Sequence, residues 1–155
     1  MRYFLKELWT KINDCDDIVR TQAEKEWQEN SALYQYRFEQ TKKKLPSCFV
    51  AEYVKRKGFH DYIIEEIALK KKRKTYLCIL KLADGSETIL ITMTDVKILQ
   101  MDVNFLQNCM QGKMTWGYSE IEIAPSNDIN LAVLCDMQNE LQFTFKSIKI
   151  QQLSP

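Results

Sequence analysis

The spacing of apolar residues along the chain changes once, between Lys57 and Phe59. Upstream of this point apolar side chains recur every three or four residues, as in Leu5, Leu8 and Ile12, whereas downstream they alternate with other residues. A repeat near 3.6 residues gives a helix with one buried face, and a repeat of two gives a strand with one buried face. The pattern therefore predicts helices first and strands second.

Three helices are predicted in the first third of the chain. The polar run 13–17 ends the first helix and offers Asp14 or Asp16 as the N-cap of the second. The second helix is the longest, and its apolar stripe is Val19, Ala23, Trp27, Tyr34 and Phe38. A short third helix follows Pro46 and ends at Gly58, after a cationic last turn that suits the helix dipole.

The rest of the chain is typical of antiparallel strands. The expected strands are residues 59–69, 75–82, 88–94, 96–103, 116–124, 129–136 and 140–150, with a loop or short helix at 104–113. Asp84-Gly85 is a preferred hairpin turn. A β-bulge at Lys146-Ser147 would keep the apolar residues of the last strand on one face. Because no strand–helix–strand spacing occurs, the sheet should be antiparallel.

The predicted fold class is α+β. We expect a single domain over residues 1–155, in which about three helices (1–58) pack on an antiparallel sheet of about six to seven strands (59–155). The length is that of one domain, and the 45% apolar and 28% charged content is typical of a soluble protein. No stretch approaches a membrane span or a signal peptide, so a cytoplasmic location without membrane association is expected.

The five cysteines are far apart and form no CxxC pair. This spacing favours free thiols over a zinc site or a disulfide framework. Cys78 and Cys135 fall inside apolar strand runs, where we expect them to be buried.

Basic charge is concentrated in the middle of the chain, although the net charge is only +1. Residues 42–74 hold eleven Lys or Arg against four Asp or Glu. These cations could bind RNA or DNA phosphates, or an acidic surface of a protein partner. The candidate partner-binding residues from this segment are Lys55, Arg56, Lys57, His60, Lys71, Lys72 and Arg73.

Candidate chemistry is sparse. The only histidine, His60, precedes Asp61, which could orient it as a general base. Neighbours in a strand point to opposite faces, however, so we expect the two side chains not to touch. We expect His60 to have a structural role, connecting the end of the helices to the sheet. Glu120 and Glu122 share a strand face that should be half-solvated, and they join the candidate partner-binding residues.

Motifs for phosphate loops, serine hydrolases, zinc peptidases and dinucleotide binding do not occur. We therefore expect a protein that is not an enzyme, with no catalytic residues and with no metal or other cofactor.

Two stretches carry a family resemblance: the opening Met1-Arg2-Tyr3-Phe4-x-Lys6-Glu7-Leu8-Trp9, and Leu45-Pro46 followed by Gly58-Phe59-His60-Asp61-Tyr62. They resemble a family of small bacterial cytoplasmic proteins known only as a domain of unknown function. Such α+β proteins are similar to immunity proteins of polymorphic toxin and contact-dependent inhibition systems. The resemblance implies a non-enzymatic protein that binds a cognate toxin and blocks its active site.

Overall fold

The helices precede the strands, as the change of period predicts. The computed structural model describes residues 1–101, 114–136 and 139–153. Its helices are α1 (Lys6–Ile12), α2 (Asp17–Thr41) and α3 (Ser47–Lys55), with 3₁₀ turns η1 (Lys42–Lys44) and η2 (Lys57–Phe59). Asp16 caps α2, because its carboxylate accepts the backbone N–H groups of Ile18 and Val19.

Eight strands form two antiparallel sheets of four, which differs from the single sheet of six to seven strands that the pattern predicts. The strands are β1 (Ile63–Lys72), β2 (Thr75–Ala83), β3 (Thr88–Val96), β4 (Ile98–Met101), β5 (Trp116–Ile123), β6 (Ile129–Cys135), β7 (Glu140–Phe145) and β8 (Ser147–Leu153). Their orders are β1-β2-β3-β8 and β4-β7-β6-β5. The loop or helix predicted at 104–113 lies outside the described residues.

Two long segments bend and pass from one sheet to the other, and the second of them divides the single strand predicted at 140–150 into two strands. β3 continues into β4 at Lys97, whose N–H donates to the Thr144 carbonyl at 2.8 Å. β7 continues into β8 at Lys146, whose N–H donates to the Thr94 carbonyl at 3.0 Å. The irregularity predicted at Lys146-Ser147 is therefore the crossing point between the sheets. It resets the alternation so that strand residues on both sides of it are buried.

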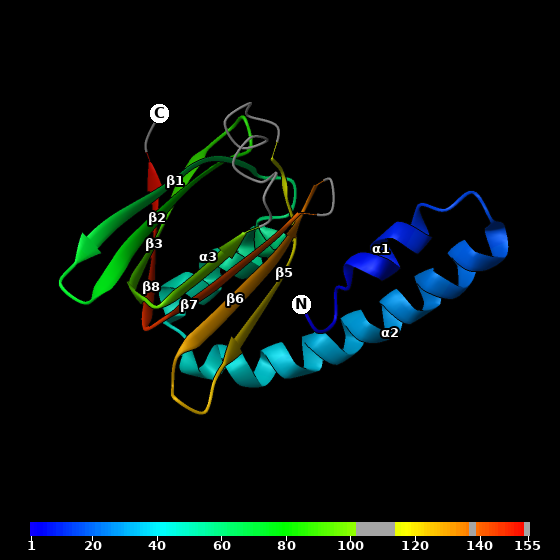
Figure 1. The fold of residues 1–155 in the computed structure, drawn as a ribbon, viewed down its shortest axis with the longest axis horizontal. Coiled ribbons are helices and arrows are strands. Elements are labelled where there is room, and N and C mark those ends of the chain that lie inside the picture. The colour runs from blue at the N-terminus through cyan, green and yellow to red at the C-terminus, as the bar shows by residue number, and fades with distance from the viewer. Residues whose placement is uncertain (102–113, 137–138, 154–155) are drawn as a thin grey trace.

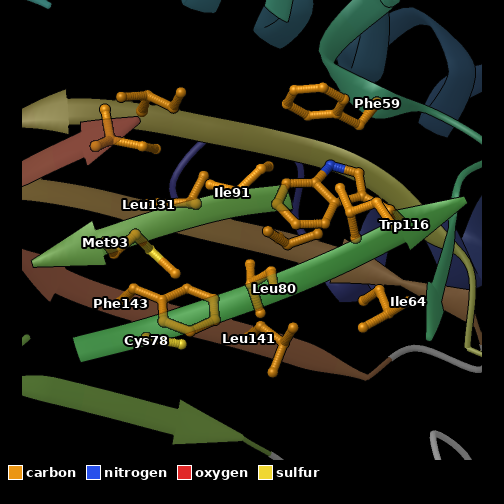
Figure 2. Close-up of a cluster of buried hydrophobic side chains, with 14 of the residues drawn as sticks. Phe59, Ile64, Cys78, Leu80, Ile91, Met93, Trp116, Leu131, Leu141 and Phe143 are labelled. Carbon is orange, nitrogen blue, oxygen red and sulfur yellow. The ribbon is translucent and has the colours of Figure 1, made fainter. Parts of the chain in front are cut away.

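The core lies between the two sheets and is closed by α3 (Figure 2). Its largest fully buried side chains include Trp116, Phe59, Phe143, Phe145 and Phe49. On one side the sheets are also joined by backbone bonds, since the Trp116 N–H donates to the Tyr62 carbonyl at 2.7 Å. Burial of each such side chain stabilises the fold by about 1.5–3 kcal/mol, so the shared core holds α3 and both sheets together.

The first two helices form a hairpin that extends beyond the sheets, with the C-terminal half of α2 running along β5 (Figure 1). A second apolar cluster holds this hairpin against β5. It contains Tyr3, Phe4 and Tyr34, with Trp27 and Tyr118 packed around them. The Phe4 and Tyr118 rings are stacked with centroids 5.1 Å apart, so the N-terminal segment is part of the packing.

Glu120 fastens the N-terminal segment to β5. Its carboxylate accepts the backbone N–H groups of Arg2 at 2.8 Å, Tyr3 at 2.7 Å and Phe4 at 2.7 Å. Glu120 is 4% exposed, so the prediction of a half-solvated position is wrong for this residue. The N-terminal segment covers the carboxylate, and its N–H groups replace the water that a charged side chain otherwise needs.

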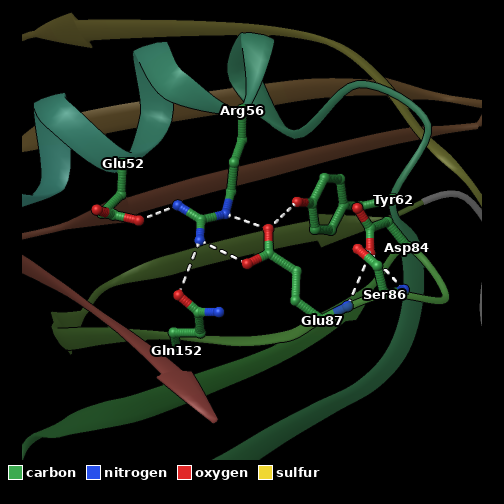
Figure 3. A network of polar contacts seen from close by, with 7 residues as sticks. All are labelled: Glu52, Arg56, Tyr62, Asp84, Ser86, Glu87 and Gln152. Atoms are coloured by element: carbon green, nitrogen blue, oxygen red, sulfur yellow. Dashed lines mark hydrogen bonds and ion pairs between the residues drawn. The ribbon is translucent and has the colours of Figure 1, made fainter. Parts of the chain in front are cut away.

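A second polar network joins α3 to the hairpin between β2 and β3 (Figure 3). Arg56 binds the Glu87 carboxylate in two places, through Nε at 2.6 Å and Nη2 at 2.7 Å. Arg56 also pairs with Glu52, and the Tyr62 hydroxyl donates to Glu87. These contacts satisfy a guanidinium that is 7% exposed.

Cys78 and Cys135 are buried, as predicted, and Cys15 and Cys48 are exposed. Cys109 lies outside the described residues. Among the helices of the described ranges, none is long and apolar enough to cross a membrane.

Candidate functional site

A groove of about 920 Å³ runs between α2, the end of α3, η2 and the start of β5. It contains aromatic, apolar and charged side chains from all four elements. Its lining includes Tyr34, Tyr36, Phe38 and Glu39 of α2, Tyr53 and Val54 of α3, Lys57 and Gly58 of η2, His60 and Asp61, and Tyr118 and Ser119 of β5. Segments distant in sequence thus share one concave surface.

Two of the apolar side chains that line the groove are largely open to solvent. Tyr36 of α2 is 68% exposed and Val54 of α3 is 56% exposed. Each lies close in sequence to a buried aromatic residue of its helix, Tyr34 or Tyr53. The buried partners hold the helices in place, and Tyr36 and Val54 are left available for contact.

A strained turn, residues 57–61, forms one end of the groove. Lys57, Phe59 and Asp61 have positive φ angles of 49°, 65° and 71°, which residues other than glycine rarely adopt. Each costs roughly 1 kcal/mol or more. The surrounding contacts maintain the turn, because Phe59 is fully buried and the Asp61 N–H donates to the Trp116 carbonyl at 2.9 Å. Strain of this kind concentrates at functional sites.

The side chains of His60 and Asp61 are in contact at this turn, with 3.0 Å between Nδ1 and Oδ2. The prediction that they would not touch is wrong, because both precede β1, which begins at Ile63 rather than at Phe59. The His60 ring also meets the Tyr118 ring edge-on, with centroids 4.8 Å apart. A carboxylate beside Nδ1 favours the tautomer with the proton on that nitrogen, so Nε2 can accept a hydrogen bond from a bound molecule.

A chain of three hydroxyls forms the floor of the groove. The Ile121 N–H donates to Tyr34 Oη at 2.9 Å, Tyr34 bonds to Tyr53, and Tyr53 bonds to Ser119 Oγ at 2.7 Å. Ser119 then donates to the Gly58 carbonyl at 3.4 Å. Tyr34 is the donor to Tyr53, and either hydroxyl of the Tyr53–Ser119 pair can donate to the other.

Burial is the main reason that the pKa values of Tyr34 and Tyr53 are raised, so both hydroxyls remain protonated. The hydroxyl chain links α2, α3, η2 and β5, and thereby fixes the shape of the groove. Gly58 fits closely beside it: its φ is +70°, and a Cβ there would lie 3.2 Å from the Tyr53 ring.

The structure separates the predicted candidate residues into distinct places. Lys57 and His60 line the groove, whereas Lys55, exposed on the last turn of α3, is not part of its lining. Arg56 is enclosed by its network with Glu52 and Glu87.

Lys71 and Lys72 are the last residues of β1, and Arg73 follows them. The first residue of β1 lies near η2, so these three cations are roughly 30 Å away from η2 along the strand. The basic segment is therefore two surfaces rather than one. On β5, Glu120 holds the N-terminal segment and Glu122 is half-buried.

The exposed apolar residues that line the groove, Tyr36 and Val54, were not among the predicted site residues. Tyr36 carried a usable signal, because it is an aromatic residue outside the predicted apolar stripe of α2. Val54 carried none, because its spacing places it in the apolar stripe of the third helix, whereas the structure leaves it 56% exposed. The hydroxyl chain had no such signal, since it depends on contacts between residues far apart in sequence.

Within residues 1–101, 114–136 and 139–153, no group of three or more His, Cys, Asp or Glu side chains is placed to hold a metal ion. The chain matches no protein-family model, no curated protein and no solved structure.

Proposed function

We propose that this protein is a non-catalytic binding protein and that the groove between α2, α3 and β5 receives part of a partner protein. The observation that carries the proposal is the pair Tyr36 and Val54, which line the same groove from two helices at 68% and 56% exposure. Exposed apolar side chains around a preformed concavity are typical of contact surfaces. Aromatic residues in particular dominate the energetics of protein interfaces.

The groove favours a partner segment with an apolar side chain and acidic neighbours. The apolar side chain would pack against Tyr36 and Val54. Lys57, which is exposed and lines the groove, would attract carboxylates. Lys42 contributes less, because it already pairs with Glu39 at 2.6 Å.

We propose further that the partner is a cognate bacterial toxin, which the protein neutralises by covering the toxin's active site. The resemblance to immunity proteins supports this identity. An inhibitor of this kind needs a rigid, complementary surface and no reacting group. The hydroxyls on the floor of the groove engage one another in an internal chain, which favours holding a shape over reacting with a substrate.

The test is to mix the protein with the purified product of the adjacent gene and to measure binding by isothermal titration calorimetry. Tyr36→Ala and Val54→Ala should each weaken the complex by about 10- to 30-fold, the range of an interface hot spot. Ile18→Ala and Ile98→Ala are matched controls at 81% and 49% exposure outside the groove, and they should change the affinity less than twofold. Absence of a complex, or equal losses in the controls, would refute the proposal.

A further inference from the structure

The turn between β1 and β2 carries a dense cluster of positive charge. Residues 70–74 are Lys-Lys-Lys-Arg-Lys, and all five side chains are exposed. Within the described residues, the recorded ion pairs of lysine and arginine involve other positions, such as Lys81 with Glu65 and Lys97 with Asp128. The turn lies at the end of the molecule opposite the α1–α2 hairpin (Figure 1). Asp95 accepts a hydrogen bond from Thr75, which follows the turn, at 2.9 Å.

Arg73 occupies a position in this turn that normally belongs to glycine. Lys72 and Thr75 pair across the ladder, so Arg73 and Lys74 are the two central residues of the hairpin turn. Arg73 has a φ of 48°, and two-residue hairpin turns use glycine, asparagine or aspartate where φ is positive. Arg73 is exposed, so packing does not explain its place there. What arginine adds at this point is charge.

Apolar surface lies directly beside the cations. Tyr76 is 45% exposed and stands opposite Lys71 in the β1–β2 register, and Leu69 on the same face is 48% exposed. Side chains opposite each other in a ladder are about 5 Å apart, so a flat aromatic ring and an ammonium group share one small surface. We call residues 69–76 the basic arm.

We propose that the basic arm binds single-stranded nucleic acid, with its lysines and Arg73 on backbone phosphates and Tyr76 stacked on an unpaired base. Cations that follow an extended strand can track a phosphate backbone, and stacking on an aromatic ring accepts any base. An anionic membrane would attract the same charges. Tyr76 and Leu69 offer little apolar surface for insertion, however, so the geometry favours nucleic acid.

Fluorescence anisotropy with a mixed-sequence 20-nucleotide single strand tests this proposal between 50 and 200 mM salt. The wild-type protein should bind with a steep loss of affinity as salt rises. Lys72→Gln/Lys74→Gln removes two phosphate contacts, so the slope of log K against log salt should become shallower by about 1.4 and affinity at 0.1 M should fall at least about tenfold. Lys11→Gln/Lys25→Gln removes the same charge from α1 and α2 and should have little effect.

Two further variants separate the contributions of charge, ring and fold. Tyr76→Ala should weaken single-strand binding several-fold without changing the salt slope, because it removes stacking and no charge. Arg73→Gly should weaken binding while leaving the melting temperature equal or higher, since glycine accepts the positive φ. The proposal is overturned by no binding at 50 mM salt, by equal losses in the control pair, or by binding only to phosphatidylcholine vesicles that contain phosphatidylserine.

Discussion

Replacement of Glu120 by glutamine should detach the N-terminal segment from β5. The carboxylate accepts three backbone N–H groups, two at Oε1 and one, from Arg2 at 2.8 Å, at Oε2. A glutamine can keep the two bonds at its carbonyl oxygen, but its NH₂ group would face the Arg2 N–H, donor against donor. Bonds to a charged acceptor contribute about 1.5–3 kcal/mol each and an unpaired buried donor costs about 1–3 kcal/mol. We therefore expect Glu120→Gln to lower the free energy of unfolding by about 2–4 kcal/mol.

Urea denaturation followed by far-UV circular dichroism measures this loss. With an m-value of about 2 kcal/mol/M, the midpoint should fall by about 1–2 M. Glu122→Gln makes the same chemical change two residues along the strand, where the side chain is half-buried, and should shift the midpoint by less than about 0.3 M. If Glu120→Gln is as stable as Glu122→Gln, the carboxylate does not hold the N-terminal segment in the way described.

Three other outcomes test separate parts of the structure. Hydrogen bonds from Arg56 and Tyr62 lower the pKa of Glu87 below its ordinary value of 4.5, so stability is present above pH 4.5 and is lost as the pH falls through the lowered value. In thermal melts the melting temperature of the wild type should fall as the pH drops below 4.5, and that of Glu87→Gln should depend less on pH in this range. Parallel pH dependences of the two melting temperatures would contradict this role of Glu87. Tyr53→Phe interrupts the hydroxyl chain and should lower the free energy of unfolding by about 1–3 kcal/mol in denaturant titrations, and a neutral result would rule out the chain as a support of the groove. Burial raises the pKa of Cys78 to about 12, so iodoacetamide followed by peptide mapping should modify Cys15 in the native protein but leave Cys78 unmodified until urea unfolds the chain.

Local features of the fold were predictable because they depend on neighbouring residues. The period of the apolar residues located the helices before Lys57 and the strands after it. Short polar side chains narrowed the cap of α2 to Asp14 or Asp16, and the structure has Asp16. The reset of alternation at Lys146 was visible in the sequence as well. Its consequence was not, because a bulge within one sheet and a crossing between two sheets have the same alternation pattern.

The polar anchors and the groove were not predictable for a different reason. His60 and Asp61 touch because residues with positive φ angles precede β1, which therefore begins only at Ile63. The spacing of apolar residues does not indicate which residues other than glycine adopt positive φ angles. Glu120 alternates with its neighbours like any solvent-facing strand residue, but a segment more than a hundred residues away covers it. Contacts of this range depend on the complete fold, so only the exposed Tyr36 pointed to the groove beforehand.

Protection of living cells tests most directly whether the groove neutralises a partner. Co-expression of the wild-type chain with the product of the adjacent gene should restore growth that this product alone suppresses. Tyr36→Ala/Val54→Asp should abolish the protection while the protein stays folded and soluble, and Ile18→Ala/Ile98→Asp should preserve it. Full protection by the groove variant, or a failure of the wild type to protect, would contradict the proposed function.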